Sequence, residues 1–398
     1  MHIVLIADTF PPLRSSGAVQ LRDLTRELIK QGHFLTVLLP THEQGRSWAL
    51  ENFEGAQVLR LKAPKTKDVG YIRRTLAEFV MPFAMLWHLR KSPFANSKWD
   101  GVVWYSPSIF FGPLVSALKR RSGCKSYLII RDIFPEWAAD MGLMKRGGLP
   151  YTCFSAVAKY QYSVADAIGV QTPGNLNYFK SWATKPGRQL EVLQNWLGSP
   201  ATKKCSIRIE QTVLAKRKVL VYAGNMGIAQ GMDILLALAD KLRSRNDVGF
   251  LFVGRGSDAL RLKNAAESLE LANTLFFDEI DPDEIPDLYA QCHVGIVALD
   301  PRHNSHNIPG KFLTYMQNGL PVLANINPGN DLAELVRKSR VGKVCESNSL
   351  NELLEMTELL LQQIDLDADL PKRCKLLFKQ QFAVEGIARQ ITGFFTRC

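Results

Sequence analysis

The sequence contains no hydrophobic run long enough to cross a bilayer and no paired-cysteine motif. Within its 398 residues, no apolar run reaches the roughly 18–20 residues that a membrane-spanning helix needs. The seven cysteines are scattered, odd in number and free of C-x-x-C spacing, which excludes a disulfide framework and a zinc site. The first apolar run, His2–Ala7, is too short for a secretory leader. We therefore expect a cytoplasmic protein with reduced thiols.

Positive charge exceeds negative charge, which points to an anionic partner. Lys and Arg number 49 and Asp and Glu 38, so the formal net charge is +11. No nucleic-acid recognition module accompanies this charge, so a nucleic-acid partner is not predicted. Residues 71–91 instead combine apolar and aromatic residues with basic residues at both ends, a composition typical of a helix that lies on an anionic membrane surface. An ordinary buried helix kinked at Pro82 explains the same segment, and both interpretations stay open.

Strand-like apolar runs alternate with amphipathic helical stretches along the chain, which predicts βαβ units and parallel sheets. The alternation restarts at residue 218 after a polar, basic connector. We therefore predict an α/β protein with two doubly wound Rossmann-like domains whose parallel sheets face each other across a cleft. The predicted parts are residues 1–197, a linker at 198–217, a second domain at 218–370, and a C-terminal helix at 371–398 that can pack back on the first domain. Strands are predicted at 2–7, 34–39, 57–61, 101–105, 126–131, 167–171, 190–193, 218–223, 249–253, 274–277, 294–298, 321–325 and 341–345.

The second domain opens with a glycine-rich turn after its first strand. Strand 218–223 runs into Gly224-Asn225-Met226-Gly227-Ile228-Ala229-Gln230-Gly231. Three glycines let backbone amides approach a ligand, and the N-terminus of the following helix favours anions. The pattern indicates a phosphate cradle that lacks the G-K-[ST] of a Walker A loop. A turn whose glycines only relieve strain is the alternative.

A second glycine pair carries the dinucleotide-binding fingerprint. Gly254-Arg255-Gly256 and Ala259 follow strand 249–253, and Asp278 comes about 20 residues later, as in NAD-binding proteins. This unit lies deep in the second domain, and the first turn of the chain has no such fingerprint. An NAD enzyme is therefore an alternative and not the main prediction.

The most specific motif is a helix that begins with proline, glycine and lysine. Asn307-Ile308-Pro309-Gly310-Lys311 leads into Phe312–Asn318, and Gly319 follows. Proline suits the first helical turn, and glycine suits the left-handed residue that ends a helix. A lysine at a helix N-terminus opposes the macrodipole unless an anion is bound. We therefore predict that Lys311 and the free amides near Gly310 hold a diphosphate, with a solvated lysine as the alternative.

Two loops of the first domain carry polar residues close to predicted strand ends. Ser16 and Gly17 follow the first strand and could admit a second phosphate of the ligand. Strand 126–131 leads into a segment with Asp132 and Glu136, either of which could orient an acceptor hydroxyl or act as a base. A pair between Arg131 and one of these carboxylates, which would anchor the loop, explains them equally well.

Two acidic segments resemble metal-binding D-x-D motifs, but neither follows a strand tip. Asp281–Asp283 precedes a helix, where aspartate is a favoured cap, and residues 365–369 lie in an acidic region before Pro371. We therefore predict neither a catalytic metal nor a bound cofactor. His303 and His306 flank the phosphate loop and are expected to be solvated.

Five blocks of the sequence together form a recognisable pattern. They are 3–12 (IVLIADTFPP), 131–136 (RDIFPE), 224–231 (GNMGIAQG), 252–256 (FVGRG) and 309–322 (PGKFLTYMQNGLPV). With these blocks the chain resembles bacterial family 4 glycosyltransferases of the retaining GT-B type along nearly its whole length. The last block is most similar to the O-antigen and capsule branch that transfers N-acetyl-L-fucosamine from UDP onto an undecaprenyl-diphosphate-linked sugar.

The resemblance implies a UDP-sugar donor in the second domain and a lipid-diphosphate-linked saccharide acceptor in the first. It also implies peripheral association with the inner face of the cytoplasmic membrane. The residues implied for the base are Gly254, Arg255, Phe277 and Ile280, and those implied for the phosphates are Asn225, Gln230 and Lys311.

The chain departs from the family pattern at two pairs of positions. Thr314 and His306 stand where acidic residues are usual, so the ribose contact and the nucleotide stay open. Ile228 and Gln230 stand where many members carry Arg and Lys, which leaves Lys311 as the main positive charge for the diphosphate.

The predicted function is a retaining, metal-independent glycosyltransferase in O-antigen or capsule synthesis. Two alternatives use the same sequence features. One is a non-hydrolysing UDP-sugar 2-epimerase on the same fold, and the other is a non-enzymatic membrane adaptor that uses residues 71–91.

Overall fold

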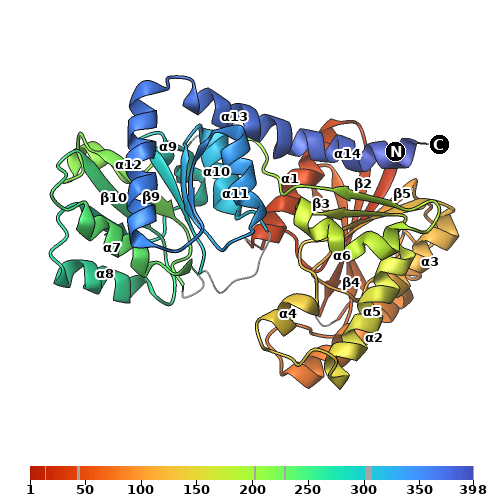
Figure 1. Cartoon of the computed structure of the whole chain (residues 1–398). Helices are drawn as coiled ribbons and strands as arrows, with labels where there is room; N and C mark the ends of the chain where they lie inside the picture. Colours follow the sequence, from red (N-terminus) through yellow and green to blue (C-terminus); the bar gives the residue numbers. More distant parts are fainter. Residues whose placement is uncertain (14, 43–44, 201–202, 228–229, 301–306, 398) are drawn as a thin grey trace. The chain divides into compact units, whose positions relative to one another are not determined.

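The computed structural model describes residues 1–13, 15–42, 45–200, 203–227, 230–300 and 307–397 (Figure 1). The chain forms two compact units. Unit 1 contains residues 1–194 and 384–398, and unit 2 contains residues 195–383. Each unit is built on one sheet with helices packed against it, as the sequence predicts.

The sheet of unit 1 has eight strands in the order β3-β4-β2-β1-β5-β6-β7-β8. All neighbours are parallel except β3, which is antiparallel to β4. The strands are β1 (His2–Ile6), β2 (Phe34–Thr41), β3 (Trp48–Phe53), β4 (Ala56–Lys62), β5 (Gly101–Tyr105), β6 (Lys125–Ile129), β7 (Ala167–Val170) and β8 (Gln189–Val192). Every residue of β5 is buried, because a central parallel strand is covered by helices on both faces.

The helices of unit 1 form two groups on opposite faces of its sheet (Figure 1). One group pairs α1 with α14, and in the other α3 contacts both α2 and α5. The helices are α1 (Ser16–Lys30), α2 (Tyr71–Leu89), α3 (Gly112–Ser122), α4 (Glu136–Asp140), α5 (Leu149–Val164), α6 (Pro173–Ala183) and α14 (Val384–Thr396). The Ser15 hydroxyl caps α1 by accepting the amide of Ala18 at 3.3 Å.

The sheet of unit 2 is fully parallel, with strand order β11-β10-β9-β12-β13-β14. Alternate residues along β9 enter two separate cores, since Val219 and Val221 pack on one face and Leu220 and Tyr222 on the other. The strands are β9 (Lys218–Ala223), β10 (Val248–Val253), β11 (Thr274–Phe277), β12 (Val294–Ala298), β13 (Val322–Asn325) and β14 (Gly342–Cys345). The α-helices are α7 (Asp233–Lys241), α8 (Ala259–Ser268), α9 (Ile285–Tyr289), α10 (Gly310–Asn318), α11 (Asp331–Ser339), α12 (Leu350–Leu366) and α13 (Leu370–Gln381). Short 3₁₀ turns lie at Ile209–Gln211 (η1) and Pro282–Glu284 (η3).

Strand β3 is absent from the sequence-based prediction. It pairs with β4 through a two-residue turn in which Glu54 and Gly55 have φ of 50° and 94°. Positive φ at both positions is the geometry of a tight hairpin turn. Asn52 stabilises the turn by accepting the amide of Gly55 at 3.1 Å. The sequence does not reveal this strand because its middle residues are exposed and its apolar run, Trp48–Leu50, is only three residues long.

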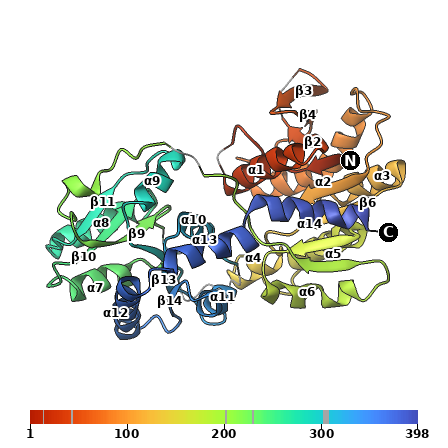
Figure 2. The ribbon, with the colours of Figure 1, turned by 90° about the horizontal axis from the view of Figure 1, so that it is seen from above.

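The unit boundaries also differ from the predicted ones. The predicted linker at 198–217 lies within unit 2, where Cys205, Ile207, Ile209 and Leu214 enter the core. The linker was predicted from the many basic residues of this segment, without regard to these four apolar residues. The predicted C-terminal helix at 371–398 is two helices that belong to different units. Helix α13 packs on α10 in unit 2, whereas α14 packs on α1 and β6 in unit 1 (Figure 2).

Candidate functional site

A pocket of about 380 Å³ opens in unit 2 at the carboxyl ends of β9, β10 and β11. Ligands of doubly wound sheets bind at this edge because the loops that follow the strands gather there. Six residues singled out from the sequence line this pocket together. They are Asn225, Gly254, Arg255, Ile280, Lys311 and Thr314.

The floor of the pocket is made by two loops whose backbones are in direct contact. The amide of Gly224 donates to Val253 O at 2.9 Å, and the amide of Met226 donates to Arg255 O at 2.8 Å. A Cβ atom on Gly254 would lie 2.1 Å from Gly224 O. A Cβ atom on Gly256 would lie equally close to Met226 O. The two glycines of the dinucleotide-like fingerprint are therefore required for packing one loop on the other, which explains them without a bound NAD.

Lys311 is held at the start of α10 against an aromatic ring. Its Nζ lies 3.3 Å from the centroid of the Tyr222 ring and 3.6 Å from the position of a Cβ on Gly224. Within the described part of the chain, no carboxylate forms an ion pair with Lys311. Burial lowers the pKa of Lys311 to about 7, because an ammonium group removed from water loses hydration. A bound anion would supply the missing partner.

Three buried tyrosines fix the geometry around Lys311. The Tyr222 hydroxyl donates to Asn225 O at 2.6 Å and so ties the strand to the loop beyond it. The Tyr315 hydroxyl donates to Val221 O at 3.2 Å and to Ile296 O at 3.0 Å. The rings of Tyr289 and Tyr315 are 4.9 Å apart. The pocket is therefore supported by side chains that are themselves hydrogen-bonded.

The remaining predicted residues of unit 2 support the pocket or border it. The Gln230 side chain accepts the amide of Gly227 at 2.9 Å and holds the glycine-rich turn. Arg255 forms an exposed ion pair with Glu279 at 3.0 Å. Phe277 borders a neighbouring hollow that shares Glu279 and Ile280 with the pocket. Gly310 is the first residue of α10 and has open space around its Cα.

Several sequence-based expectations fall on residues 228–229 and 301–306. These expectations concern Ile228, His303 and His306, which lie outside the described residues.

The predicted residues of unit 1 differ in how closely they are packed. A Cβ on Gly17 would lie 3.2 Å from both Thr9 Cγ2 and the Tyr105 hydroxyl, so Gly17 lets α1 approach the sheet. Ser16 begins α1 and is exposed. Asp132 is exposed as well.

Glu136 is engaged in a network that joins three helices. Its carboxylate accepts Arg146 Nη1 at 3.0 Å, the Tyr151 hydroxyl at 2.7 Å and the Tyr178 hydroxyl at 3.3 Å. These bonds connect α4 to the start of α5 and to α6. The anchoring interpretation of Glu136 therefore fits the structure better than a free base, although the anchoring cation is Arg146 and not Arg131.

The two D-x-D segments have structural partners as well. Asp281 caps η3 by accepting the amide of Asp283 at 3.1 Å. The acidic groups of the second segment pair with Lys218, Lys372 and Arg373. Across the described ranges, no group of three or more His, Cys, Asp or Glu side chains is placed to hold a metal ion.

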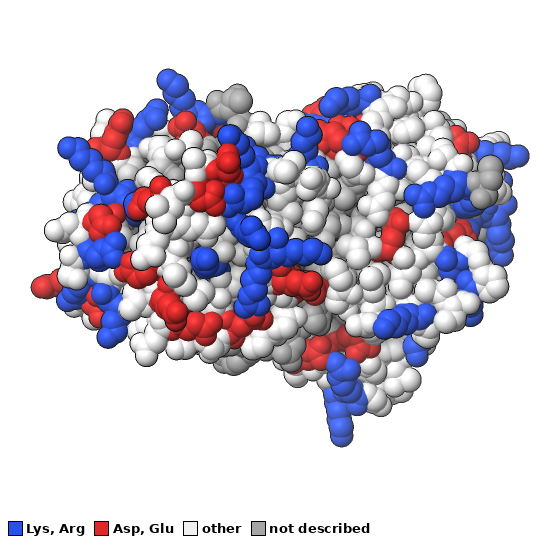
Figure 3. Space-filling view, turned by 45° about the horizontal axis from the view of Figure 1, so that its top comes forward, with Lys and Arg blue, Asp and Glu red and all other residues white. Residues whose placement is uncertain are grey.

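Positive charge is dispersed over the surface and not gathered in a single patch on the face shown in Figure 3. Lys and Arg side chains occur on both units there, alternating with Asp and Glu. Although the chain has a net charge of +11, its basic side chains do not form on this face the continuous basic stripe that nucleic-acid binding uses.

Comparison with known proteins relates the segment that contains this pocket to glycosyltransferases. Residues 217–363, which include the whole pocket, match the family described as "Glycosyl transferases group 1". The probable glycosyltransferase WbjE of Pseudomonas aeruginosa is 24% identical over 235 residues, which cover 58% of each protein. The putative colanic acid biosynthesis glycosyl transferase WcaI of Escherichia coli is 22% identical over 380 residues, covering 87% of this chain and 86% of WcaI.

A solved structure shares the fold over the full length. The crystal structure of Anabaena HepE in complex with UDP and glucose superposes with a TM-score of 0.65 at 14% identity and covers 99% of both chains. The fold is therefore GT-B, with two doubly wound α/β units, as the sequence predicts. These comparisons support a glycosyltransferase related to enzymes of bacterial polysaccharide synthesis.

Proposed function

We propose that the chain is a retaining glycosyltransferase whose UDP-sugar donor binds in the unit 2 pocket. The observation that carries the proposal is the Lys311 ammonium group, which lies against Tyr222 without a described carboxylate partner. A diphosphate at this point would be held by that charge and by the free amides at the start of α10. The UDP found in the HepE structure supports a UDP-linked donor on this fold.

Residues around Lys311 have proposed roles that follow from their positions. The loop after β9 faces the phosphates through Asn225, with Gln230 holding the turn. Thr314 lies in the middle of α10 and lines the pocket; we assign it to the ribose in place of the usual acid. The residues proposed for the base are Gly254, Arg255, Phe277 and Ile280.

The chemistry that we propose is a substitution with retained configuration. As the bond from the anomeric carbon to the diphosphate breaks, negative charge develops on the leaving oxygen. Lys311 and the α10 amides are already in place and stabilise that charge. The acceptor hydroxyl attacks the anomeric carbon from the same face and gives its proton to the leaving diphosphate. The proposal requires no metal ion and no bound cofactor.

Donor affinity is expected to depend on the protonation of Lys311. Since the pKa of Lys311 in the free protein is about 7 and a bound diphosphate raises it, binding takes up a proton above neutral pH. The Kd for UDP should therefore weaken with rising pH, by up to about tenfold per unit above pH 7. Calorimetry between pH 6.5 and 8.5 measures this slope. Lys311→Arg should flatten it because a guanidinium stays charged; a flat profile for the unaltered protein would contradict the assignment.

The specific reaction that we propose is transfer of N-acetyl-L-fucosamine to a lipid-diphosphate-linked sugar in O-antigen or capsule synthesis. It follows from the sequence resemblance of the Pro309–Val322 block and agrees with the polysaccharide context of WcaI. Mass spectrometry of a lipid-linked acceptor incubated with a panel of UDP-sugars tests it. We expect the acceptor to gain the mass of one N-acetyl-L-fucosamine. Gain of a different sugar would correct the donor, and failure of every UDP-sugar would remove the reaction.

A lipid-linked acceptor requires contact with a membrane, and α2 offers a suitable surface. One side of α2 is buried, through Ala77, Met81, Met85 and Leu89. The opposite side is apolar yet exposed, with side chains from 36% to 88% accessible. These residues are Tyr71, Ile72, Leu76, Phe79, Val80, Phe83 and Trp87. The helix thus combines both sequence interpretations, since one stripe belongs to the core and the other is apolar and exposed.

The exposed face of α2 continues onto the α4–α5 connection. A chain of aromatic contacts leads from Phe79 to Phe110, then to Phe154 and Phe134, with centroid distances of 5.0, 6.4 and 5.2 Å. Beyond it, apolar side chains are again exposed. They are Trp137, Met141, Leu143 and Leu149. Basic residues flank both parts, at Arg73, Arg90, Lys91 and Lys145.

We propose that this face binds an anionic membrane surface. Basic groups attract the headgroups while the aromatic and aliphatic side chains enter the interface. Among the described helices, none has the length and apolarity needed to cross a bilayer. The proposed association is therefore peripheral, at the inner face of the cytoplasmic membrane.

The double variant Phe83→Glu/Trp87→Glu is expected to weaken binding to anionic vesicles by at least about tenfold. Two exposed aromatic side chains, which would enter the membrane interface, are replaced by charges that anionic lipids repel. Flotation with vesicles of phosphatidylglycerol and phosphatidylethanolamine measures the bound fraction. Leu260→Glu is the matched control, since Leu260 is 71% exposed on α8 of unit 2. Equal flotation of the double variant and the control would show that α2 is not the membrane contact.

A further inference from the structure

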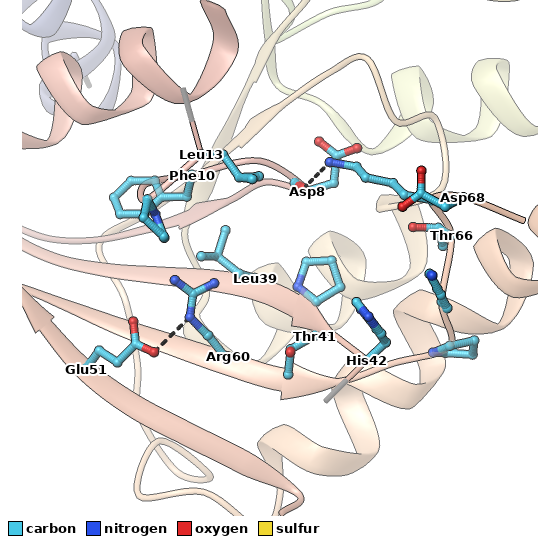
Figure 4. Close-up of a pocket in the computed structure, with 15 residues that line it drawn as sticks. Asp8, Phe10, Leu13, Leu39, Thr41, His42, Glu51, Arg60, Thr66 and Asp68 are labelled. Carbon is cyan, nitrogen blue, oxygen red and sulfur yellow. Dashed lines mark hydrogen bonds and ion pairs between the residues drawn. The ribbon is translucent and has the colours of Figure 1, made fainter. Parts of the chain in front are cut away.

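Unit 1 contains a second and larger pocket, of about 590 Å³. It lies at the carboxyl ends of β1, β2 and β4, where ligands of doubly wound sheets bind (Figure 4). Its size falls within the range of small-molecule sites. None of the residues that the sequence singled out for donor binding or catalysis lines it.

One wall is the β3–β4 hairpin, which presents an arginine and a glutamate in fixed positions. Arg60 Nε pairs with Glu51 Oε1 at 2.9 Å, and Arg60 Nη2 donates to Pro11 O at 3.2 Å. These two contacts hold the guanidinium from both sides. Figure 4 shows it extending from β4 beside Leu39 into the pocket. A preorganised donor and acceptor pair of this kind can bind two adjacent hydroxyl groups.

The opposite wall is the loop from β4 to α2. Lys67 Nζ donates to Asp8 O at 3.3 Å and so ties this loop to the end of β1. Thr66 and Asp68 of the same loop face the pocket from the side opposite Arg60 (Figure 4). The polar groups therefore converge from three separate chain segments.

The charge of the lining decides which kind of ligand fits. Three cationic residues are present, namely Arg60, Lys65 and Lys67. Three acidic residues balance them, namely Asp8, Glu51 and Asp68. A phosphate or diphosphate site needs an excess of positive charge, which this pocket does not have. A neutral ligand with many hydroxyl groups suits the mixture of donors and acceptors.

The lining also offers apolar surface between the polar groups. Leu13, Leu39, Pro40 and Pro64 present carbon atoms to the cavity. Sugar rings have C–H faces as well as hydroxyl edges, so this alternation matches a saccharide better than a purely polar metabolite.

The position of the pocket relates it to the membrane-facing helix of the same unit. The loop that forms one wall ends at Gly70, directly before α2. The first two residues of α2, Tyr71 and Ile72, belong to the exposed apolar face and are 88% and 81% accessible. A saccharide in the pocket would thus lie at the end of α2, close to where a lipid carrier enters the bilayer.

We propose that the unit 1 pocket binds a sugar residue of the acceptor and that Arg60 and Glu51 position it. The inference rests on the proposed function, to which it adds the place and chemistry of acceptor recognition. Arg60 and Glu51 are positioning residues, because they hold the acceptor and take no part in bond breaking.

Saturation-transfer NMR on the full chain tests the proposal. The probes are the methyl glycosides of glucose, galactose, N-acetylglucosamine and N-acetylgalactosamine, together with inorganic pyrophosphate. We expect at least one glycoside to bind and pyrophosphate not to displace it. Arg60→Ala should weaken that binding by about tenfold, the size expected for hydrogen bonds from a charged group. Glu51→Gln, which keeps the hairpin intact, should weaken it severalfold.

The matched control is Arg245→Ala, which removes a comparable arginine–glutamate pair of unit 2, Arg245 with Glu358. It should leave glycoside binding unchanged. Calorimetry with UDP on the same samples separates the two proposals. UDP binding without any glycoside binding, or glycoside binding that resists both pocket variants, would overturn the pocket assignment and leave the donor site standing. Glycoside binding that responds to Arg60→Ala without any UDP affinity would instead remove the proposed transferase.

Discussion

Replacing Lys311 with alanine is expected to lower kcat/KM by about 10²-fold or more, the loss seen when one fixed donor to a developing oxyanion is removed. Lys311 is the cation that lies against Tyr222 at the start of α10, and no described carboxylate neutralises it. Its charge is therefore available to the leaving diphosphate. Steady-state kinetics with the donor found in the mass-spectrometric assay measure the loss.

The melting temperature of the Lys311→Ala variant distinguishes this catalytic loss from a loss caused by unfolding. The pKa of Lys311 is lowered in the folded protein, so the unfolded chain binds more protons between about pH 7 and 10. The group therefore opposes folding most strongly at and below neutral pH, and its penalty is relieved as the pH rises. Lys311→Ala should keep or raise the melting temperature at pH 7. Lys338→Ala, an exposed lysine of α11, is the control for activity, and near-normal turnover of Lys311→Ala would exclude Lys311 from the reaction.

Gly254→Ala is expected to lower the free energy of unfolding by about 3 kcal/mol or more and to abolish UDP binding. The added Cβ would lie 2.1 Å from Gly224 O, and φ at Gly254 is 142°. A methyl group cannot be accommodated there unless the loops after β9 and β10 separate, and those loops form the floor of the pocket. Thermal unfolding and calorimetry with UDP measure the two effects.

The control for this substitution is Gly386→Ala in α14. A Cβ at Gly386 would meet nothing within 4 Å, and alanine favours a helix over glycine by about 1 kcal/mol. This variant should be as stable as the parent protein or slightly more stable. A Gly254→Ala protein that melts normally and still binds UDP would show that the two loops are not packed as described.

The positions of most strands and the grouping of residues around the unit 2 pocket could be predicted because they depend on local patterns. The buried strands of unit 2 are apolar runs in the sequence; glycines follow β9 and β10, and a Pro-Gly-Lys helix start follows β12. Parallel sheets gather those turns at one edge. The prediction that Asn225, Arg255 and Lys311 share a site therefore needed no knowledge of side-chain contacts, and the pocket confirms their proximity.

The contacts that give the pocket its properties could not be predicted in this way. In the sequence, Tyr222 is one of several residues of a buried strand. Only the folded chain shows that its ring lies against the ammonium group of Lys311, which is distant in sequence. For Glu136 the sequence left a base and a loop anchor equally open, and only the folded chain shows that the hydroxyls of Tyr151 and Tyr178 donate to its carboxylate. The sequence did not predict the unit 1 pocket, for a related reason. Its Arg60–Glu51 wall depends on the pairing of β4 with β3, a strand whose middle residues are exposed and which the sequence did not predict.

The assignment of α14 to unit 1 has a consequence for how the protein is made. Residues 195–383 form one uninterrupted segment, so unit 2 has all its parts as soon as that stretch leaves the ribosome. Unit 1 begins first but finishes last, because Ile387, Ile391 and Phe394 complete its core. The usual order, in which the N-terminal domain folds first during synthesis, is thus reversed here for the final step. Losing only the last dozen residues would leave unit 2 whole and the first 194 residues without their closing helix.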